Sequence, residues 1–314
     1  MSVVISPSER AAKAVLTVSP GTPQGASFDA FSDSSPMPSW RQQVHGHAVI
    51  SFARRDGADR LTHLSHHDPL RVLFPAPARG DIPLAALVNS SGGMVAGDRL
   101  DIAFSVGAGA RGMALGAAAE KIYRSPAAAC EIAVTLEAGA GAWLEWVPQE
   151  TILFEGARFR RCNRVKLAAD ARLLAGEMLI FGRAAHGENL TTGAIEDRWE
   201  LYRDDRLVWA DILRMEGDLT RPLQGRAGLA GARACATLIY AGSDAADMLV
   251  VARDLLPQSD DGFRVAASVV NGVLVLRWLG FAPERLRVAY GAFWGALRAR
   301  LAGLPAALPR LWYI

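Results

Sequence analysis

The chain has 314 residues, of which 51% are hydrophobic and 21% charged, and its formal net charge is +2. This composition is that of a globular protein and excludes an intrinsically disordered chain. The small net charge, with no dense basic stretch, argues against a nucleic-acid-binding protein. A chain of this length can bury a substantial core, either as one large β domain or as two ordinary domains.

Residues 1–38 contain five prolines among many serines and glycines, and they show no sustained apolar period. This composition predicts a disordered or loosely attached leader. From Trp40 onward the sequence alternates between apolar and polar residues, which is typical of half-buried strands. We therefore predict a single β-rich domain over residues 39–314.

Five of the six histidines lie between positions 45 and 67. On a strand, His45 and His47 point to the same face, and imidazole is a ligand for nickel, copper and zinc. The two residues are therefore candidates for a transient metal-binding face. The alternative is a pair of exposed histidines at a sheet edge, because no Cys or carboxylate completes a closed site.

The segment 89–98, Asn-Ser-Ser-Gly-Gly-Met-Val-Ala-Gly-Asp, interrupts the alternation. Its simplest interpretation is a tight, irregular turn between two strands. Gly92 and Gly93 permit positive φ or close approach of another backbone, and Asp98 can accept hydrogen bonds from the turn that it closes. We assign a structural role in this turn to Asn89, Gly92, Gly93 and Asp98.

A weak repeat aligns residues 106–110, 136–140 and 167–171 at separations of 30 and 31, with Gly109, Gly139 or Asp170 as the turn residue. Such a period predicts stacked supersecondary units. The alternative is that Gly-Ala turns recur by chance. Stacking would bring together the polar residues that follow the turns, around Lys121, around Glu150 and around Arg183 to Glu188.

Residues 107–112 satisfy the pattern Gly-x-Gly-x-x-Gly, which on its own is a weak signal for a dinucleotide site. The strand before it alternates in polarity, whereas a central parallel strand buried on both faces is almost entirely apolar. A following helix would contain two destabilising glycines, Gly112 and Gly116. A plain turn is the favoured interpretation.

Five glutamates lie in or beside the region predicted to stack: Glu145, Glu150, Glu155, Glu177 and Glu188. Interleaved arginines leave two interpretations open, a ladder of oxygen ligands along a polar channel or ion pairs that hold strands together. A catalytic acid–base pair is disfavoured because no aromatic substrate-binding cluster accompanies it. The three cysteines, Cys130, Cys162 and Cys235, fit neither a disulfide framework nor a zinc site.

The last part of the chain is predicted to form a hairpin and two helices. The hairpin spans 199–209 around Asp204 and Asp205. One helix begins at Ser243-Asp244 and stops before Pro257, and a second runs from Pro283 to Gly303. Helices that follow a long β region indicate a mainly β or segregated α+β fold.

Taken together, these features resemble the UreD (UreH) family of urease accessory proteins. The matching segments follow one another in the family's order: 68–72, 89–98, 121–125, 144–154, 171–177, 182–183 and 309–312. The chain departs from the family at 115–120, which reads Leu-Gly-Ala-Ala-Ala-Glu where the family has a Thr-Thr-Gln type run. Roles of those polar side chains are therefore not carried over.

The resemblance implies a mainly β protein with a stacked, β-helix-like body and two helices near the C-terminus. It implies a non-enzymatic chaperone, which binds the urease apoprotein and a UreF-type partner that in turn holds a UreG-type GTPase. Nickel is then cargo in transit through the protein and is not permanently bound.

On this basis we assign Glu150, Glu177 and Glu188, with His45 and His47, to a weak nickel passage that Glu150 and Glu177 line or gate. The C-terminal stripe of Phe293, Trp294 and Leu297 is a candidate surface for the UreF-type partner, and the alternative is that it packs on the protein's own sheet. Two other functions stay open: a metal-free scaffold adaptor and a polysaccharide-acting enzyme with a stacked β body. The sequence lacks a secretory signal and a membrane-spanning apolar run, so we expect a cytoplasmic protein.

Overall fold

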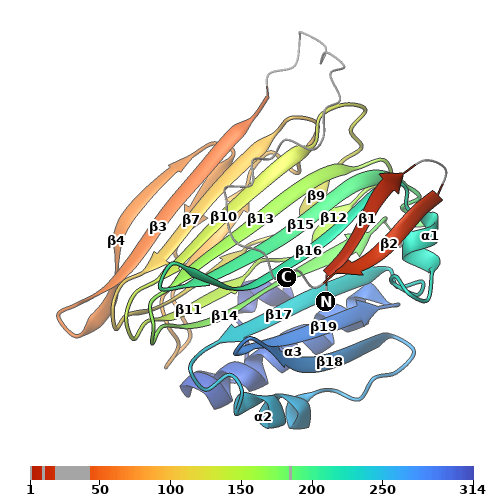
Figure 1. The fold of residues 1–314 in the computed structure, drawn as a ribbon. Helices are drawn as coiled ribbons and strands as arrows, with labels where there is room; N and C mark the ends of the chain where they lie inside the picture. Colours follow the sequence, from red (N-terminus) through yellow and green to blue (C-terminus); the bar gives the residue numbers. More distant parts are fainter. Residues whose placement is uncertain (1, 9–10, 18–42, 184–185) are drawn as a thin grey trace.

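The computed structural model describes residues 2–8, 11–17, 43–183 and 186–314. Two sheets lie face to face, and helices cover the outer face of one of them (Figure 1). In spatial order, the first sheet contains β2 (Ala11–Thr17), β1 (Ser2–Ser8), β16 (Arg206–Asp218), β15 (Thr192–Arg203), β13 (Arg158–Leu167), β10 (Cys130–Ala138), β7 (Arg99–Val106), β3 (His45–Arg55) and β4 (Ala58–His67).

The second sheet contains β18 (Phe263–Val270), β19 (Val273–Gly280), β17 (Ala234–Ala241), β14 (Arg172–Phe181), β11 (Trp143–Val147), β8 (Arg111–Gly116), β6 (Leu84–Asn89) and β5 (Leu70–Leu73). Two short strands, β9 (Glu120–Ile122) and β12 (Thr151–Leu153), pair with each other, and β12 also pairs with β14. The helices are α1 (Thr220–Gln224), α2 (Met248–Leu255), α3 (Pro283–Ala302) and the 3₁₀ helix η2 (Arg310–Tyr313).

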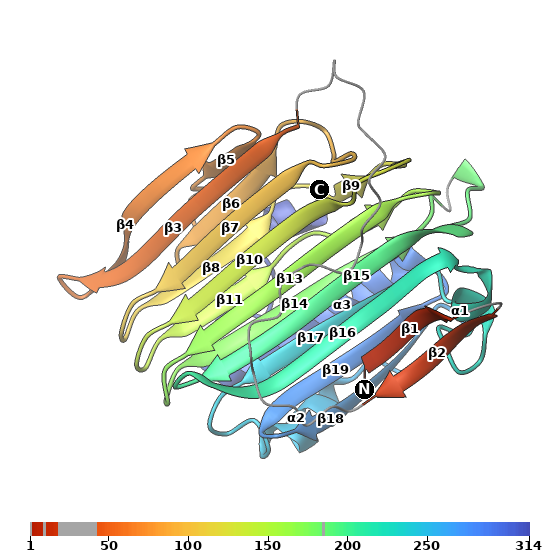
Figure 2. The same ribbon diagram turned by 45° about the horizontal axis from the view of Figure 1, so that its top comes forward.

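The middle of the body is a stack of coils, in which the chain runs along the first sheet, turns, and returns along the second (Figure 2). The strand pairs β7–β8, β10–β11 and β13–β14 form successive coils, and their strands are parallel within each sheet. The predicted stacked β body is thus confirmed. The Gly-x-Gly-x-x-Gly segment is the turn between β7 and β8, and the element after it is a strand, not the helix that a dinucleotide site requires.

The predicted register of the repeat is wrong in its middle copy. Arg111 pairs with Trp143, which pairs with Arg172, so Gly141 and not Gly139 is the counterpart of Gly109. Gly109 and Gly141 adopt φ of +64° and +63°. Gly139 is required for a different reason, because a Cβ there would lie 2.8 Å from the backbone nitrogen of Ala108 in the neighbouring coil.

The hairpin of β15 and β16 has the predicted turn, with φ of +48° at Asp204 and +59° at Asp205. Helix α3 begins at Pro283 and is followed by Gly303 in the left-handed region, also as predicted. Helix α2 begins at Met248, later than predicted, because residues 243–247 form turns.

The buried apolar residues in the described part of the chain form two cores, one between the sheets and one between the second sheet and the helices. Phe293, Trp294 and Leu297 are 2%, 0% and 0% exposed and belong to the second core. Their assignment to a partner-binding surface is therefore wrong, and the alternative of packing on the protein's own sheet is confirmed. The outer face of the second sheet, which includes Leu276 and Trp278, is apolar and requires such a cover.

Part of the predicted leader is described as strands: β1 pairs in parallel with β16, and β2 pairs with β1. The remainder of the leader, residues 18–38 with 1, 9 and 10, lies outside the described residues. Within the described ranges, no helix is both long and apolar enough to cross a membrane.

Candidate functional site

Two cavities of about 170 and 120 Å³ lie between the two sheets, and Glu177 on β14 is in the wall of both. The first cavity extends from Glu177 to the turn at Asn89, Gly92 and Gly93. The second extends from Glu177 to Asp211 on β16 and Arg277 on β19. Most of the interior is apolar, so the polar side chains in the walls of these two cavities differ from the surrounding core.

A buried charged cluster occupies the junction of the cavities. The Arg161 guanidinium makes two hydrogen bonds to Asp197, Nε to Oδ1 at 3.0 Å and Nη2 to Oδ2 at 2.7 Å. Its Nη1 lies 2.5 Å from Oε2 of Glu177 and donates to Oγ1 of Thr151 at 3.0 Å. The indole Nε1 of Trp146 donates to the other Glu177 oxygen at 3.1 Å. One cation therefore serves two carboxylates, which leaves the cluster with an excess negative charge.

The three charged side chains point inward because of their positions in alternating strands. Arg161 shares a face of β13 with Phe159 and Val165, which are fully buried. Burial raises the pKa of Glu177 to about 7, although the charge of Arg161 opposes this shift. Burial thus disfavours the ionised form of Glu177 compared with that of an exposed glutamate, and the ion pair with Arg161 favours it.

The outer end of the first cavity is formed by the turn after β6. Asn89 donates from Nδ2 to both carboxylate oxygens of Glu120, at 3.0 and 3.1 Å, and its Oδ1 accepts from the Ser91 backbone at 3.0 Å. Asp98 closes the turn by accepting from the backbone nitrogens of Val95 at 2.9 Å and Val44 at 3.2 Å. The turn carries the chain from the second sheet to the first, so it joins the layers rather than closing a hairpin.

Glycine is needed at positions 92 and 93 for different reasons, and an alanine variant at each position distinguishes them. Gly92 has φ of +76° and open space where a Cβ would be, so Gly92→Ala should lower the free energy of unfolding by about 1 kcal/mol. Gly93 has φ of +137°, and a Cβ there would lie 2.5 Å from the Tyr123 ring and 2.7 Å from the Lys121 carbonyl. Gly93→Ala should therefore cost about 3 kcal/mol, from strain and overpacking together. Urea denaturation measures both, and equal losses would contradict this account.

Stability should depend on pH through Glu120, because burial raises the pKa of its carboxyl to about 7. Between about pH 4.5 and 7 the folded protein holds a proton that the unfolded chain has released, so the free energy of unfolding falls as pH rises. The slope from one such group is at most about 1.4 kcal/mol per pH unit. Denaturant titrations from pH 5 to 8 should show a smaller decline for Glu120→Gln, and an unchanged decline would show that Glu120 does not contribute.

The far end of the second cavity carries a second ion pair. Arg277 pairs with Asp211 and donates from Nη1 to Oγ1 of Thr237 at 2.9 Å. The side chain of Arg277 is 35% exposed, so this end of the second cavity lies near the surface. Sequence reasoning missed Arg161, Asp197, Asp211, Arg277 and Glu120. For Arg161 and Asp197 the sequence did contain a signal, because each is a charged residue at a strand position where the alternation places apolar, inward-facing residues.

Glu150 and Glu188 do not line the cavities. The stack does bring Lys121, Glu150, Arg183 and His186 together, as predicted, in a surface groove beside the start of α3. There Glu150 pairs with Arg287 at 3.0 Å, and Glu188 pairs with Arg183 at 2.8 Å. Of the three predicted passage carboxylates, the structure places only Glu177 in the interior.

His45 and His47 lie on the outer side of the first sheet, away from both cavities. His45 Nε2 is 2.6 Å from Oδ2 of Asp101, and the His47 ring stacks on that of His67 with centroids 5.8 Å apart. Among the residues that the structure describes, no group of three or more His, Cys, Asp or Glu side chains is arranged to hold a metal ion. All three cysteines are free thiols, and burial raises the pKa of Cys162 to about 11 and that of Cys235 to about 12.

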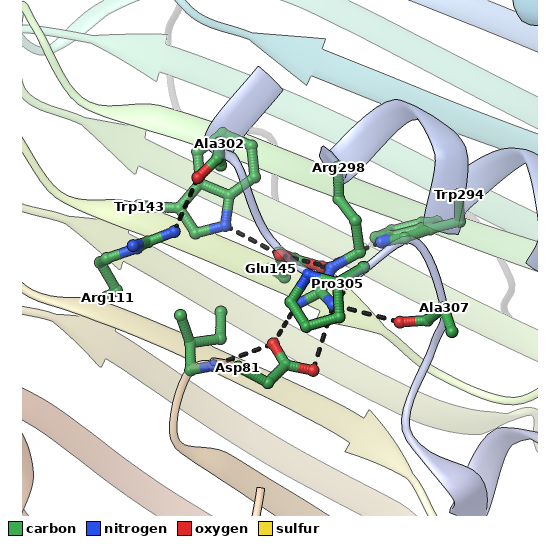
Figure 3. Close-up of polar contacts among 10 residues, drawn as sticks. Asp81, Arg111, Trp143, Glu145, Trp294, Arg298, Ala302, Pro305 and Ala307 are labelled. Carbon is green, nitrogen blue, oxygen red and sulfur yellow. Dashed lines mark hydrogen bonds and ion pairs between the residues drawn. The ribbon is translucent and has the colours of Figure 1, made fainter. Parts of the chain in front are cut away.

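A second buried charged cluster fixes α3 on the second sheet (Figure 3). Arg298 Nε lies 3.1 and 3.0 Å from the two oxygens of Glu145, and Nη2 lies 2.6 Å from Oδ1 of Asp81. Trp143 and Trp294 donate indole hydrogens to Glu145 at 2.8 and 3.0 Å. Arg298 also donates to the carbonyls of residues 305 and 307, at 3.2 and 3.1 Å. Glu145 therefore has a structural environment, with each oxygen bonded.

Comparison with known proteins gives one consistent family. The family model described as UreD urease accessory protein matches residues 44–313. A urease accessory protein UreD from Magnetococcus marinus is 48% identical over 276 residues, which cover 87% of this chain and 95% of that protein. One from Methylobacterium sp. is 41% identical over 285 residues, covering 89% and 99%. One from Granulibacter bethesdensis is 43% identical over 243 residues, covering 77% and 99%.

Proposed function

Because the chain belongs to the UreD family of urease accessory proteins, it has a role in urease maturation, and we propose that it acts as a non-enzymatic chaperone that helps deliver nickel. It binds the urease apoprotein and a UreF-type protein, and through the latter a UreG-type GTPase. Nickel passes between the two sheets as cargo. The family is one of accessory proteins and not of enzymes, which agrees with this role.

The observation that carries the proposal is the pair of cavities that share Glu177. Carboxylates occur at three points along them: Glu120 at one end, Glu177 with Asp197 at the junction, and Asp211 at the other end. In a core that is otherwise apolar, buried carboxylates are costly unless a cation accompanies them. A hydrated divalent cation is a suitable transient partner for such a series.

The chemistry of the ligands supports transit rather than storage. Carboxylate oxygens bind nickel less tightly than thiolates or imidazoles do, so the ion can leave. The partly buried thiol of Cys235 also lines the second cavity, and its raised pKa keeps it protonated and a poor ligand. A hydrated ion that moves from one oxygen ligand to the next is never held in a closed site.

Co-purification tests the partner part of the proposal. The tagged chain, expressed with urease subunits and UreF-type and UreG-type proteins, should retain all of them, and omission of the UreF-type protein should remove the GTPase only. Retention of the GTPase without the UreF-type protein would contradict this order of assembly. The nickel part is tested by substitution of Glu177, described in the Discussion.

A further inference from the structure

Arg161 lies at the junction of the two cavities, and it makes more contacts with one of its two carboxylate partners than with the other. Its side chain is 3% exposed, and it lies between Glu177, also 3% exposed, and Asp197, at 10%. Asp197 accepts hydrogen bonds from two nitrogens of the guanidinium, Nε and Nη2. Glu177 contacts only the third nitrogen, Nη1, which also donates a hydrogen bond to Thr151.

This uneven arrangement lets one contact break while the others persist. If Nη1 leaves Glu177, Arg161 still has both hydrogen bonds to Asp197 and the bond to Thr151. The guanidinium thus stays paired with a carboxylate, which a buried cation requires. Trp146 meanwhile holds the other oxygen of Glu177, so the carboxylate keeps its orientation.

We propose that Arg161 is a tethered counter-cation. Its contact with Glu177 opens when a divalent cation binds that carboxylate, and it forms again when the ion leaves. The proposal rests on the function proposed above, and it names the residue that keeps the ion from being trapped. A buried carboxylate without a neighbouring cation would bind a divalent ion strongly, because charges interact strongly at low dielectric. With Arg161 at 2.5 Å, the ion must displace Nη1 and then remains beside a positive charge that favours its release.

No electron is transferred in the exchange, and when Glu177 is ionised no proton is transferred either. When Glu177 is protonated, the ion displaces its proton to solvent. The ion binds Oε2 of Glu177 as the contact between Oε2 and Nη1 of Arg161 opens, and Arg161 stays bonded to Asp197 and Thr151. The contact closes again when the ion leaves. The same charge discriminates by valence, because a monovalent ion gains less from Glu177 than it loses by displacing an ion pair at this distance. The cluster therefore favours weak, exchangeable binding of divalent cations.

The test is the Ni²⁺ affinity of the purified full-length chain, measured by competition with a chelator of known affinity. Arg161→Gln removes the counter-cation and should bind Ni²⁺ at least tenfold more tightly than the wild type. Arg161→Gln with Asp197→Asn removes a cation and an anion together, which avoids an uncompensated charge in the fold, and it should also bind more tightly. Affinities no higher than that of the wild type in both variants would overturn the proposal.

Arg161→Gln with Glu177→Gln locates the effect. This variant should return to the wild-type affinity or below it, and retention of tight binding would place the ion elsewhere and overturn the proposal. The two proposals fail separately. Urease that is fully loaded with nickel by Glu177→Gln would reject the passage itself, whereas the affinities of the isolated chain decide the role of Arg161.

Discussion

Urease matured with the Glu177→Gln variant should contain about tenfold less nickel than urease matured with the wild type. Glutamine has the shape of glutamate and can still accept the hydrogen bond from Trp146, but it has no negative charge at the junction of the cavities. The ion then loses the one ligand that both cavities share. Nickel per urease active site is measured by metal analysis of urease purified from cells that express the whole set of accessory proteins.

Glu150→Gln is the matched control for this experiment. Glu150 is also a partly buried glutamate paired with an arginine, but it lies in the surface groove beside α3 and outside the cavities. This variant should leave the nickel content unchanged, and both variants should assemble with urease to the same extent. Normal nickel loading by Glu177→Gln would reject the passage and leave a metal-free adaptor as the better account.

Arg298→Met should lower the free energy of unfolding by about 3–5 kcal/mol, the usual cost of removing one partner of a buried ion pair. Arg298 is fully buried, and its loss leaves the carboxylates of Glu145 and Asp81 without their cation. Two backbone carbonyls after α3 lose their donor as well. Because the cluster joins α3 to the second sheet, the whole second core should loosen. Denaturant unfolding followed by tryptophan fluorescence measures the loss.

Two further variants test whether the loss of stability comes from the unpaired buried charges. Arg298→Met combined with Glu145→Leu should be more stable than the single variant, because the uncompensated charge on Glu145 is removed with its partner. Arg54→Met breaks the surface pair with Asp59 and should cost less than about 1 kcal/mol. An Arg298→Met protein as stable as Arg54→Met would contradict the structural role of the cluster.

The sequence predicted the fold where local signals were strong. Alternation and turn residues located the strands of the body, and Pro283 and Gly303 marked both ends of α3. The register of the repeat was not predictable, because Gly and Ala occur at several adjacent positions in each turn and only the three-dimensional stack distinguishes Gly141 from Gly139. The prediction that the apolar stripe on α3 binds a partner was wrong, because an apolar stripe does not reveal whether a sheet or another protein covers it.

The site was predicted in part. Glu177 was chosen for its place near stacked turns, but so were Glu150 and Glu188, which the structure places outside the cavities. The phase of the strand separates them: Glu177 alternates with buried Ala175 and Leu179, and therefore points between the sheets. The same criterion selects Arg161 and Asp197. Which inward charges meet across the sheets depends on the register, which the sequence did not provide.

Anomalous diffraction at the nickel absorption edge, from crystals of the chain soaked in millimolar NiCl₂, tests the central claim most directly. The passage predicts nickel between the two sheets, within the cavities and next to the carboxylate of Glu177. Nickel found only on the outer surface, for example beside His45 and His47, with none in the cavities would contradict it.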